Sequence, residues 1–247
     1  MLLHTRQTPS HENRGATAPR GIHPFTEQKL RNIRYIRLLL CLVIVLACGF
    51  PAYASQKGAG KTNTDKIRLF GTVEFRGPLK TLPAWLSVLE RNAKNPIFVP
   101  GSRLNSKTTW DDFKAKAEKL SPLEQLRMVN SFWNQWPYRE DTEVYGKTDY
   151  WAIPAQFRKN SGDCEDYSIA KYFTLRALGF PVEKMRIVVL METIRNIAHA
   201  VLVVYLDGDA YVLDNLSKNV LSHTRYKNYL PQFSVNEKNR WVHVRPK

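Results

Sequence analysis

The sequence predicts an α+β protein, because helical patterns come before strand patterns along the chain. Amphipathic helical patterns occupy residues 82–93, 109–120 and 121–136, and a further helix begins at Cys164. Three β-like stretches follow that helix. Such segregation of helices and strands is typical of α+β domains rather than of alternating β-α units. With 247 residues, of which 43% are hydrophobic and 24% charged, the chain is long enough to bury one sizeable core.

The first 54 residues predict an export signal. Four basic residues between positions 29 and 37 precede an apolar run at 38–50, and Ala52-Tyr53-Ala54 then forms a small-residue cleavage site before Ser55. The apolar run is short for a transmembrane helix. An uncleaved membrane anchor and acylation of Cys48 in a bacterial lipobox are alternatives. We therefore expect a periplasmic protein that is not stably inserted in the membrane.

The basic composition does not by itself point to nucleic acid. Removing the seven basic and two acidic residues of the segment 1–54 takes the formal net charge from +15 to +10. A positive surface can favour acidic partners, nucleic acid or anionic lipid. Here Lys and Arg are scattered along the sequence rather than clustered with aromatic residues, and no nucleic-acid motif is present. We expect a soluble basic surface and no nucleic-acid partner.

Residues 55–105 predict a small N-terminal lobe, and 106–247 predict the main core. Residues 67–75 are β-like, and the helix at 82–93 follows. Thr109 is a helix cap, and Ser121 opens the next helix with Pro122 at its first position and Glu124 at its third. Residues 137–163 lack clear periodicity, which predicts a long ordered loop beside the functional site.

A helix is predicted from Cys164 to about Leu178, with Asp163 as its N-cap and Gly179 as its stop signal. The β-like stretches after it are Met185–Glu192, Ala198–Leu206 and Ala210–Leu213. Asp207-Gly208 predicts a two-residue hairpin turn between the last two of them.

Cys164 is the one cysteine that remains after export, because Cys41 and Cys48 lie in the signal. A lone thiol in an oxidising compartment is either buried and inert or retained for its reactivity. At the first turn of a helix, unpaired N–H groups and the helix dipole lower the pKa of a thiol. This position makes Cys164 a candidate nucleophile.

His199 and Asp214 are the candidate partners of that thiol. The hairpin turn at 207–208 places the two residues close to opposite each other across adjacent strands. His199 can take the thiol proton, and Asp214 can orient the imidazole. Taken singly, a core histidine and a turn-forming aspartate are the more common interpretations, and only their agreement with Cys164 favours a catalytic triad.

Asp163, Glu165 and Asp166 place three carboxylates around the candidate nucleophile. Their negative charges oppose a thiolate by like-charge repulsion. Helix capping and the helix dipole account for part of this acidity. A cluster of oxygen ligands also suits Ca²⁺, whose charge would cancel the repulsion. The residues alone leave both interpretations open.

Several motifs resemble the bacterial transglutaminase-like cysteine proteinases, and among them the LapG-type periplasmic proteases. They are Gly162-Asp163-Cys164-Glu165-Asp166-Tyr167, Ala198-His199, Val212-Leu213-Asp214-Asn215, Tyr145-Gly146, Asp149-Tyr150-Trp151, Ala170-Lys171-Tyr172 and Leu175-Arg176. The resemblance implies a papain-like transglutaminase core, with the nucleophile at a helix N-terminus packed on an antiparallel sheet. It also implies a Cys164-His199-Asp214 triad and Ca²⁺ at the acidic positions.

The same resemblance implies a biological role. It is cleavage of a large surface adhesin near its N-terminus, controlled by an inner-membrane receptor for cyclic di-GMP. Two alternatives remain: a transglutaminase-like acyltransferase acting on protein glutamine, and an inactive binding module on the same core.

The N–H of Cys164 is a natural oxyanion donor. A second donor could come from Asn130, Trp133, Asn134 or Trp151.

Overall fold

The computed structural model describes residues 67–246. Residues 1–66 and Lys247 lie outside the described part. The expected signal, its cleavage before Ser55 and the alternative acylation of Cys48 therefore stay predictions, as does the division of the chain at residue 105. In the described part, no helix has the length and apolar character needed to cross a membrane.

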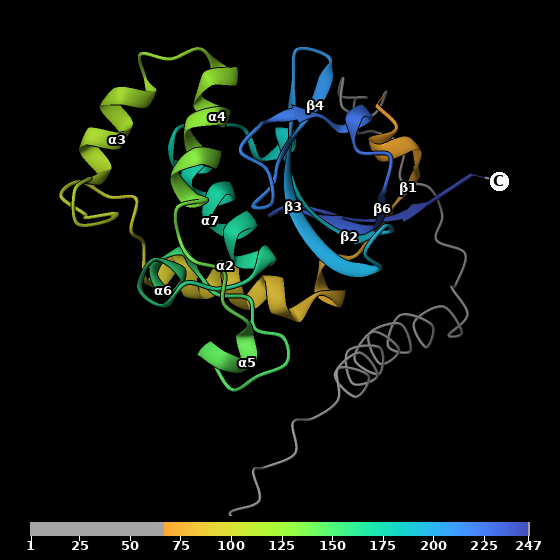
Figure 1. Cartoon of the computed structure of the whole chain (residues 1–247), viewed down its shortest axis with the longest axis horizontal. Helices are drawn as coiled ribbons and strands as arrows, with labels where there is room; N and C mark the ends of the chain where they lie inside the picture. Colours follow the sequence, from red (N-terminus) through yellow and green to blue (C-terminus); the bar gives the residue numbers. More distant parts are fainter. Residues whose placement is uncertain (1–66, 247) are drawn as a thin grey trace, which may run out of the picture. The chain divides into compact units, whose positions relative to one another are not determined.

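The order of elements confirms the α+β class, with most helices preceding most strands (Figure 1). The α-helices are α2 (Pro83–Lys94), α3 (Trp110–Ala117), α4 (Pro122–Trp133), α5 (Asp141–Val144), α6 (Pro154–Asn160) and α7 (Cys164–Ala177). The strands are β1 (Val73–Gly77), β2 (Met185–Glu192), β3 (Ile197–Leu206), β4 (Asp209–Leu213), β5 (Leu221–Ser222), β6 (Tyr229–Val235) and β7 (Arg240–Val244). Short 3₁₀ turns lie at Leu69–Gly71, Leu79–Thr81, Val182–Lys184 and His223–Arg225.

The strands form one seven-stranded antiparallel sheet in the order β1-β7-β6-β2-β3-β4-β5. Figure 1 shows the helices gathered on one side of this curved sheet. Helix α7 packs directly on β3 and β2, and α4 and α6 pack against α7 from the other side. The helix that begins at Cys164 is therefore the central element between the sheet and the outer helices.

The capping signals correctly mark where two helices begin. The backbone N–H of Asp112 donates to Thr109 Oγ1 at 3.1 Å, and the N–H of Ser121 donates to Glu124 Oε2 at 3.0 Å. The pair at Ser121 forms the expected capping box, and the predicted cap Thr109 forms one as well, with Asp112. Helices α3 and α4 end at residues 117 and 133, about one turn earlier than the sequence pattern predicts. Helix ends carry weaker local signals than capped starts.

Three sequence-based expectations are corrected. The segment 137–163 is not a continuous loop, because it contains the short helices α5 and α6. The β-like stretch at 67–75 divides into a 3₁₀ turn and the first half of β1. Strands β6 and β7 were not predicted, and β6 contains Pro231 beside a register shift in its pairing with β2. Proline and irregular pairing both obscure a strand pattern.

Aromatic side chains fill the space between α7 and its neighbours. Trp85 of α2, Trp133 of α4 and Tyr172 of α7 are fully buried. The indole of Trp85 meets the ring of Tyr172 edge-on, with centroids 5.5 Å apart, and it donates to the carbonyl of Asn236 at 2.9 Å. Burial of each such side chain stabilises the fold by roughly 1.5–3 kcal/mol, so α7 is firmly held by α2 and α4.

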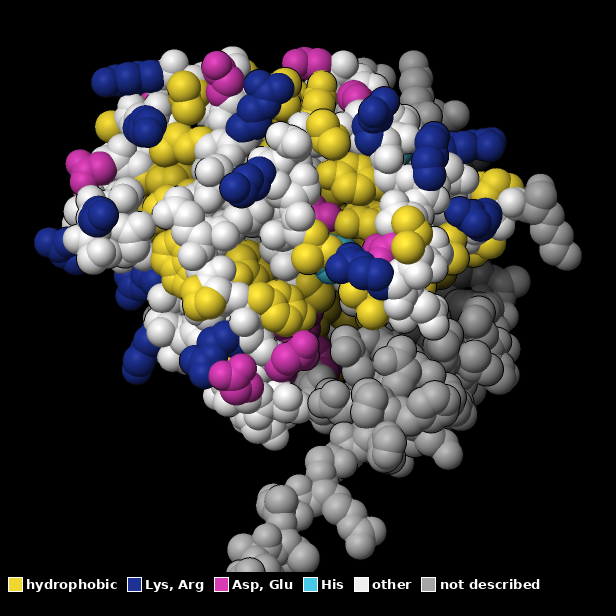
Figure 2. Space-filling view, viewed as in Figure 1, with side chains coloured by type: hydrophobic (Ala, Val, Ile, Leu, Met, Phe, Trp, Pro, Cys, Tyr) yellow, Lys and Arg dark blue, Asp and Glu magenta, His cyan; other side chains and the backbone are white. Residues whose placement is uncertain are grey.

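Basic side chains do not form one continuous patch on the face seen in Figure 2. Lys and Arg side chains are spread over that face, with apolar and uncharged surface between them. This distribution agrees with the scattered basic residues of the sequence and gives no basic stripe on that face.

We predict that His243 makes the fold sensitive to acid. This buried imidazole bonds to Thr72 Oγ1 at 2.9 Å and Ser234 Oγ at 2.8 Å. Burial, and then the charge of Arg186, lower the pKa of His243 from 6.5 to about 3. Between these values the unfolded state binds more protons, so stability falls as the pH falls, by up to about 1.4 kcal/mol per pH unit.

Urea unfolding of the wild type and of His243→Gln between pH 7 and pH 4 measures this contribution. The wild type should lose more free energy of unfolding than the variant across this range. Equal losses in the two proteins would show that His243 is not the source.

Candidate active site

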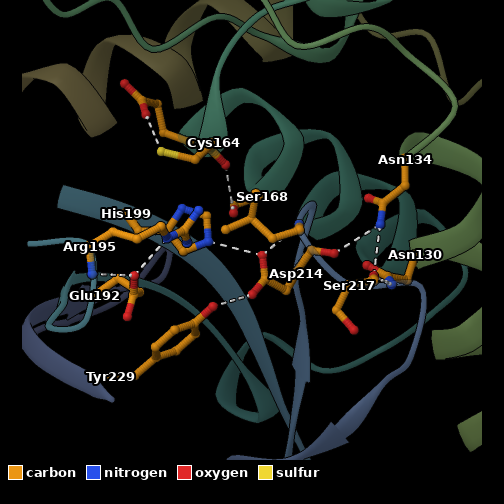
Figure 3. Close-up of polar contacts among 12 residues, drawn as sticks. Asn130, Asn134, Cys164, Ser168, Glu192, Arg195, His199, Asp214, Ser217 and Tyr229 are labelled. Atoms are coloured by element: carbon orange, nitrogen blue, oxygen red, sulfur yellow. Dashed lines mark hydrogen bonds and ion pairs between the residues drawn. The ribbon is translucent and has the colours of Figure 1, made fainter. Parts of the chain in front are cut away.

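Cys164 lies at the first position of α7 and is partly buried. Its thiol donates to Glu165 Oε2 at 3.2 Å, and its carbonyl accepts from Ser168 Oγ at 3.0 Å (Figure 3). Within residues 67–246 it is the one cysteine, and it is not in a disulfide. The predicted position of the thiol at a helix start is therefore confirmed.

The predicted capping role of the Asp163 side chain is wrong. Asp163 is the N-cap residue of α7 by its extended backbone, but its side chain makes no capping hydrogen bond. Its carbonyl, rather than its carboxylate, accepts from the N–H groups of Asp166 and Tyr167. One oxygen of this buried carboxylate, Asp163 Oδ1, has no hydrogen-bond partner among the described residues.

His199 and Asp214 are in direct contact. His199 Nε2 and Asp214 Oδ1 are 2.9 Å apart, and the two side chains are only 4% and 1% exposed. The turn at Asp207-Gly208 has φ of 50° and 81°, the two positive values of a type I′ hairpin. Pairing of β3 with β4 ends at Leu202↔Leu213, so the contact joins diagonal rather than directly opposite positions.

Asp214 is held by more partners than the sequence indicates. Tyr229 Oη donates to Oδ2 at 2.5 Å, and the N–H of Leu216 donates to Oδ1 at 2.9 Å. Burial opposes ionisation of this carboxyl, but the hydrogen bonds and the charge of His199 outweigh it and lower its pKa. Asp214 is therefore an ionised acceptor fixed in one position.

Two asparagines of α4 support the loop that follows Asp214. Asn134 Nδ2 donates to the carbonyls of Asp214 at 2.9 Å and Ser217 at 3.0 Å, and Asn130 Nδ2 donates to the carbonyl of Ser217 at 2.9 Å (Figure 3). The indole of Trp133 donates to Thr174 Oγ1 at 2.8 Å. These three donors, considered from the sequence as oxyanion ligands, are committed to structural bonds.

Cys164 and His199 lie on α7 and β3, two elements that pack against each other. The backbone amide of Ala200, which follows His199, acts on the Cys164 thiol and favours its ionised form. Figure 3 shows the two side chains on neighbouring elements. Burial and the charges of Glu165 and Asp163 have the larger effect, and together they raise the pKa of the thiol well above its usual value.

The carboxylates next to Cys164 are part of a larger acidic cluster. It contains three overlapping groups of three residues, and within each group one ligand atom of every residue lies within 4.8 Å of the other two. They are Asp163-Cys164-Glu165, Asp141-Asp149-Glu165 and Asp141-Asp163-Asp166. The structure thus brings the three predicted metal ligands together and adds Asp141 and Asp149. Only the tertiary fold brings these two acids close, since no spacing rule connects them to residues 163–166.

Oxygen atoms in this cluster are buried without hydrogen-bond partners among the described residues. They belong to Asp141 (Oδ1), Asp163 (Oδ1) and Asp166 (Oδ2). Buried carboxylates normally have hydrogen-bond or ionic partners, and an orphaned one is costly. Such inward-facing, unsatisfied oxygens fit a hard cation such as Ca²⁺.

The pKa values of the cluster point the same way. Burial, followed by neighbouring carboxylates, raises the pKa of Asp163 to about 12. Burial also raises the pKa of Asp141 to about 7, against the hydrogen bond from Tyr150. The pKa values of Glu165 and Asp166 are raised as well, chiefly by burial. Without a compensating positive charge, these acids resist sharing one small volume as carboxylates.

Gly162 makes room for one of these acids. A Cβ at this position would lie 2.0 Å from Asp166 Oδ2 and 2.9 Å from Asp166 Cβ. The Asp166 carboxylate can therefore turn back over the chain and accept from the N–H of Ala152 at 2.6 Å. Any larger residue at position 162 would collide with Asp166, which explains the glycine of the Gly-Asp-Cys-Glu-Asp motif.

Comparisons with known proteins give the family of the chain. The family model described as bacterial transglutaminase-like cysteine proteinase matches residues 105–247, more than half of the chain. Solved structures of Legionella pneumophila LapG match with 34% identity over 54% of this chain and a TM-score of 0.49. They include a calcium-bound and an EGTA-treated form, and the match covers 73–75% of those chains. No curated protein matches in a sequence search.

One further charged group lies close to the site. Lys171 of α7 is fully buried, and its Nζ has no hydrogen-bond partner among the described residues. It lies 5.8 Å from the centroid of the Tyr167 ring, and Asp214 is the charge that acts on it. Burial, only partly offset by Asp214, lowers the pKa of Lys171 to about 7.

We predict that Lys171→Met stabilises the protein at pH 7 by about 1–4 kcal/mol, because it replaces a buried, unpaired ammonium by an apolar chain of similar length. In the wild type, stability should rise as the pH rises from 7 towards 10.5, since the unfolded state binds the extra proton in this range. Denaturant unfolding at pH 7 and pH 9 measures both effects. A destabilised variant with an unchanged pH slope would contradict them.

Proposed function

We propose an endopeptidase activity for this chain, which belongs to the bacterial transglutaminase-like cysteine proteinases and is therefore a cysteine peptidase. In this proposal Cys164 is the nucleophile, His199 is the base, and Asp214 orients His199. The contact of His199 Nε2 with a buried, ionised Asp214 at 2.9 Å is the observation that carries this proposal. A fixed, ionised carboxylate on one ring nitrogen orients the imidazole and leaves the other nitrogen for proton transfer.

The proposed mechanism uses the free nitrogen of that imidazole. Since Nε2 is held by Asp214, Nδ1 takes the proton of the Cys164 thiol. The thiolate attacks the carbonyl carbon of a peptide bond, and a C–S bond forms. The resulting oxyanion can be bound by the N–H of Cys164, since the first N–H groups of a helix have no acceptor within it.

Collapse of this intermediate breaks the C–N bond. His199 delivers its proton to the leaving amine, and an acyl-enzyme remains on Cys164. A water molecule then attacks the acyl carbon while His199 takes one of its protons. The C–S bond breaks, the new carboxylic acid leaves and the proton returns to the thiolate sulfur. Asp214 stabilises the imidazolium at each stage and keeps its proton on Nε2.

We also propose that the acidic cluster holds Ca²⁺. The buried carboxylate oxygens without partners support this assignment. The residues that would hold the ion are Asp141, Asp149, Asp163, Glu165 and Asp166. When bound, the ion would supply the positive charge that offsets the repulsion among these carboxylates and their repulsion of a thiolate. This spacing is not that of an EF-hand, because the ligands come from three separate segments.

The proposed setting is the periplasm, with the N-terminal region of a large surface adhesin as substrate and an inner-membrane cyclic di-GMP receptor as regulator. The export pattern of residues 1–54 and the motifs shared with LapG-type proteases support it. Cleavage of such an adhesin would release cells from a biofilm.

A direct test compares cells that carry the wild type with cells that carry Cys164→Ser. N-terminal peptides of the envelope and secreted fractions are identified by mass spectrometry. We expect one new N-terminus close to the start of a very large repeat protein in the wild type alone. If purified enzyme instead incorporates a labelled amine into glutamine side chains without peptide cleavage, the chain is an acyltransferase.

We predict a graded loss of peptidase activity among variants of the triad. Cys164→Ser and His199→Ala should each lower kcat/KM by at least about 10²–10⁴-fold, since each removes a reacting group. Tyr229→Phe removes only one hydrogen bond to Asp214 and should cost less than Asp214→Asn. Assays of purified protein beginning at Ser55 measure the series, with thermal unfolding as the control for folding. Full activity of His199→Ala would overturn the assignment.

We predict that Ca²⁺ binds and stabilises the protein. At a free concentration of 100 times the dissociation constant, the gain is about 2.7 kcal/mol, and EGTA should reverse it. Asp141→Asn should weaken binding, although the sequence motif does not contain this residue. Glu118→Gln is the matched control. This exposed acid follows the end of α3, pairs with Lys114 one turn earlier and is not part of the acidic cluster. Unchanged thermal midpoints and activity after chelation would contradict the calcium site.

A further inference from the structure

A short extended segment, residues 150–152, links the acidic cluster to helix α2. The backbone N–H of Tyr150 donates to Asp141 Oδ2, and the N–H of Ala152 donates to Asp166 Oδ1 at 2.6 Å. Both acceptors are buried members of the acidic cluster. In each carboxylate one oxygen is thus held by the segment, while the other is an orphaned oxygen described above.

The opposite side of the segment is held by Arg91 of α2. Its Nη2 donates to the carbonyl of Trp151 at 2.6 Å. The amides of residues 150 and 152 therefore point to the cluster, and the carbonyl between them points to α2. This alternation is expected of extended chain, in which successive residues face opposite sides.

Arg91 also fixes the side chains next to this segment. Its Nη1 donates to Tyr150 Oη at 2.9 Å and to Gln156 Oε1 at 2.7 Å. The guanidinium carbon is 4.9 Å from the centroid of the Tyr150 ring. Gln156 Nε2 in turn donates to Tyr150 Oη at 2.9 Å. One guanidinium thus makes contacts with α6 and with the segment, which only a forked, planar donor can do.

Arg91 lies ahead of residues 105–247, which the family model covers. We propose that Arg91 is a positioning residue for the cation site: it holds residues 150–152 so that their amides orient Asp141 and Asp166 with one oxygen of each free for the ion. The inference rests on the proposed calcium site. Groups that orient metal ligands from outside commonly change the affinity for the metal 10–100-fold when they are removed.

The simpler alternative is that Arg91 only ties α2 to the core. That role predicts a loss of stability with an unchanged affinity for Ca²⁺. Lys94 provides the matched control on the same helix, because this exposed residue pairs with Glu90, one turn away. Lys94→Met removes the same charge from α2 without touching the segment 150–152.

The experiment titrates CaCl₂ into calcium-stripped wild type, Arg91→Met, Arg91→Lys and Lys94→Met by calorimetry. We expect Arg91→Met to bind at least 10-fold more weakly than the wild type. Arg91→Lys keeps the charge but cannot span the same acceptors, so it should bind at least threefold more weakly. Lys94→Met should match the wild type. If Arg91→Met does not fold, Arg91→Lys carries the comparison.

Amide hydrogen exchange in the calcium-free proteins supplies a second measure. The amides of Tyr150 and Ala152 should exchange faster in both Arg91 variants than in Lys94→Met. If the wild type binds Ca²⁺ and the Arg91 variants bind it equally well, the inference is overturned while the proposed function stands. If the wild type itself binds no Ca²⁺, the proposed calcium site fails, and the positioning role fails with it.

Discussion

Repulsion among clustered carboxylates at the start of α7, three of them buried, is the constraint on which the rest of the site depends. Asp141, Asp149, Asp163, Glu165 and Asp166 share one small volume beside the Cys164 thiol. Such a cluster is stable only if its acids are protonated or face a positive ion, because water is excluded from most of it. The unpartnered Asp163 Oδ1, the small Gly162 and the segment 150–152 all adjoin this cluster.

The partner side of the site is built differently, since both carboxylate oxygens of Asp214 accept hydrogen bonds. Asp214 accepts from His199, Tyr229 and the Leu216 amide, and Asn134 fixes its carbonyl. A satisfied network in a low-dielectric interior is rigid, whereas an unsatisfied one is poised to bind. The structure therefore has a fixed His-Asp pair at the sheet and a group of mutually repelling carboxylates around the start of α7, where Cys164 also lies.

Local signals in the sequence predicted most of the elements that carry the site. The Asp207-Gly208 turn fixed the strands on either side, and the capping boxes at Thr109 and Ser121 fixed two helix starts. Where such signals were weak the prediction failed. Helices α5 and α6 are too short to show periodicity, and Pro231 with a register shift hides β6. These elements are held by tertiary packing rather than by their own propensity.

By itself the sequence determined the fold class, the helix start at Cys164 and the pairing of His199 with Asp214, because each depends on nearest neighbours or on a two-residue turn. Tertiary structure alone decided that Asp141 and Asp149 join the acidic cluster, that Asp163 does not cap its helix and that Arg91 reaches the segment 150–152. These contacts bring together residues far apart in the chain, and their positions depend on how α2, α6 and α7 pack. No local spacing encodes that packing.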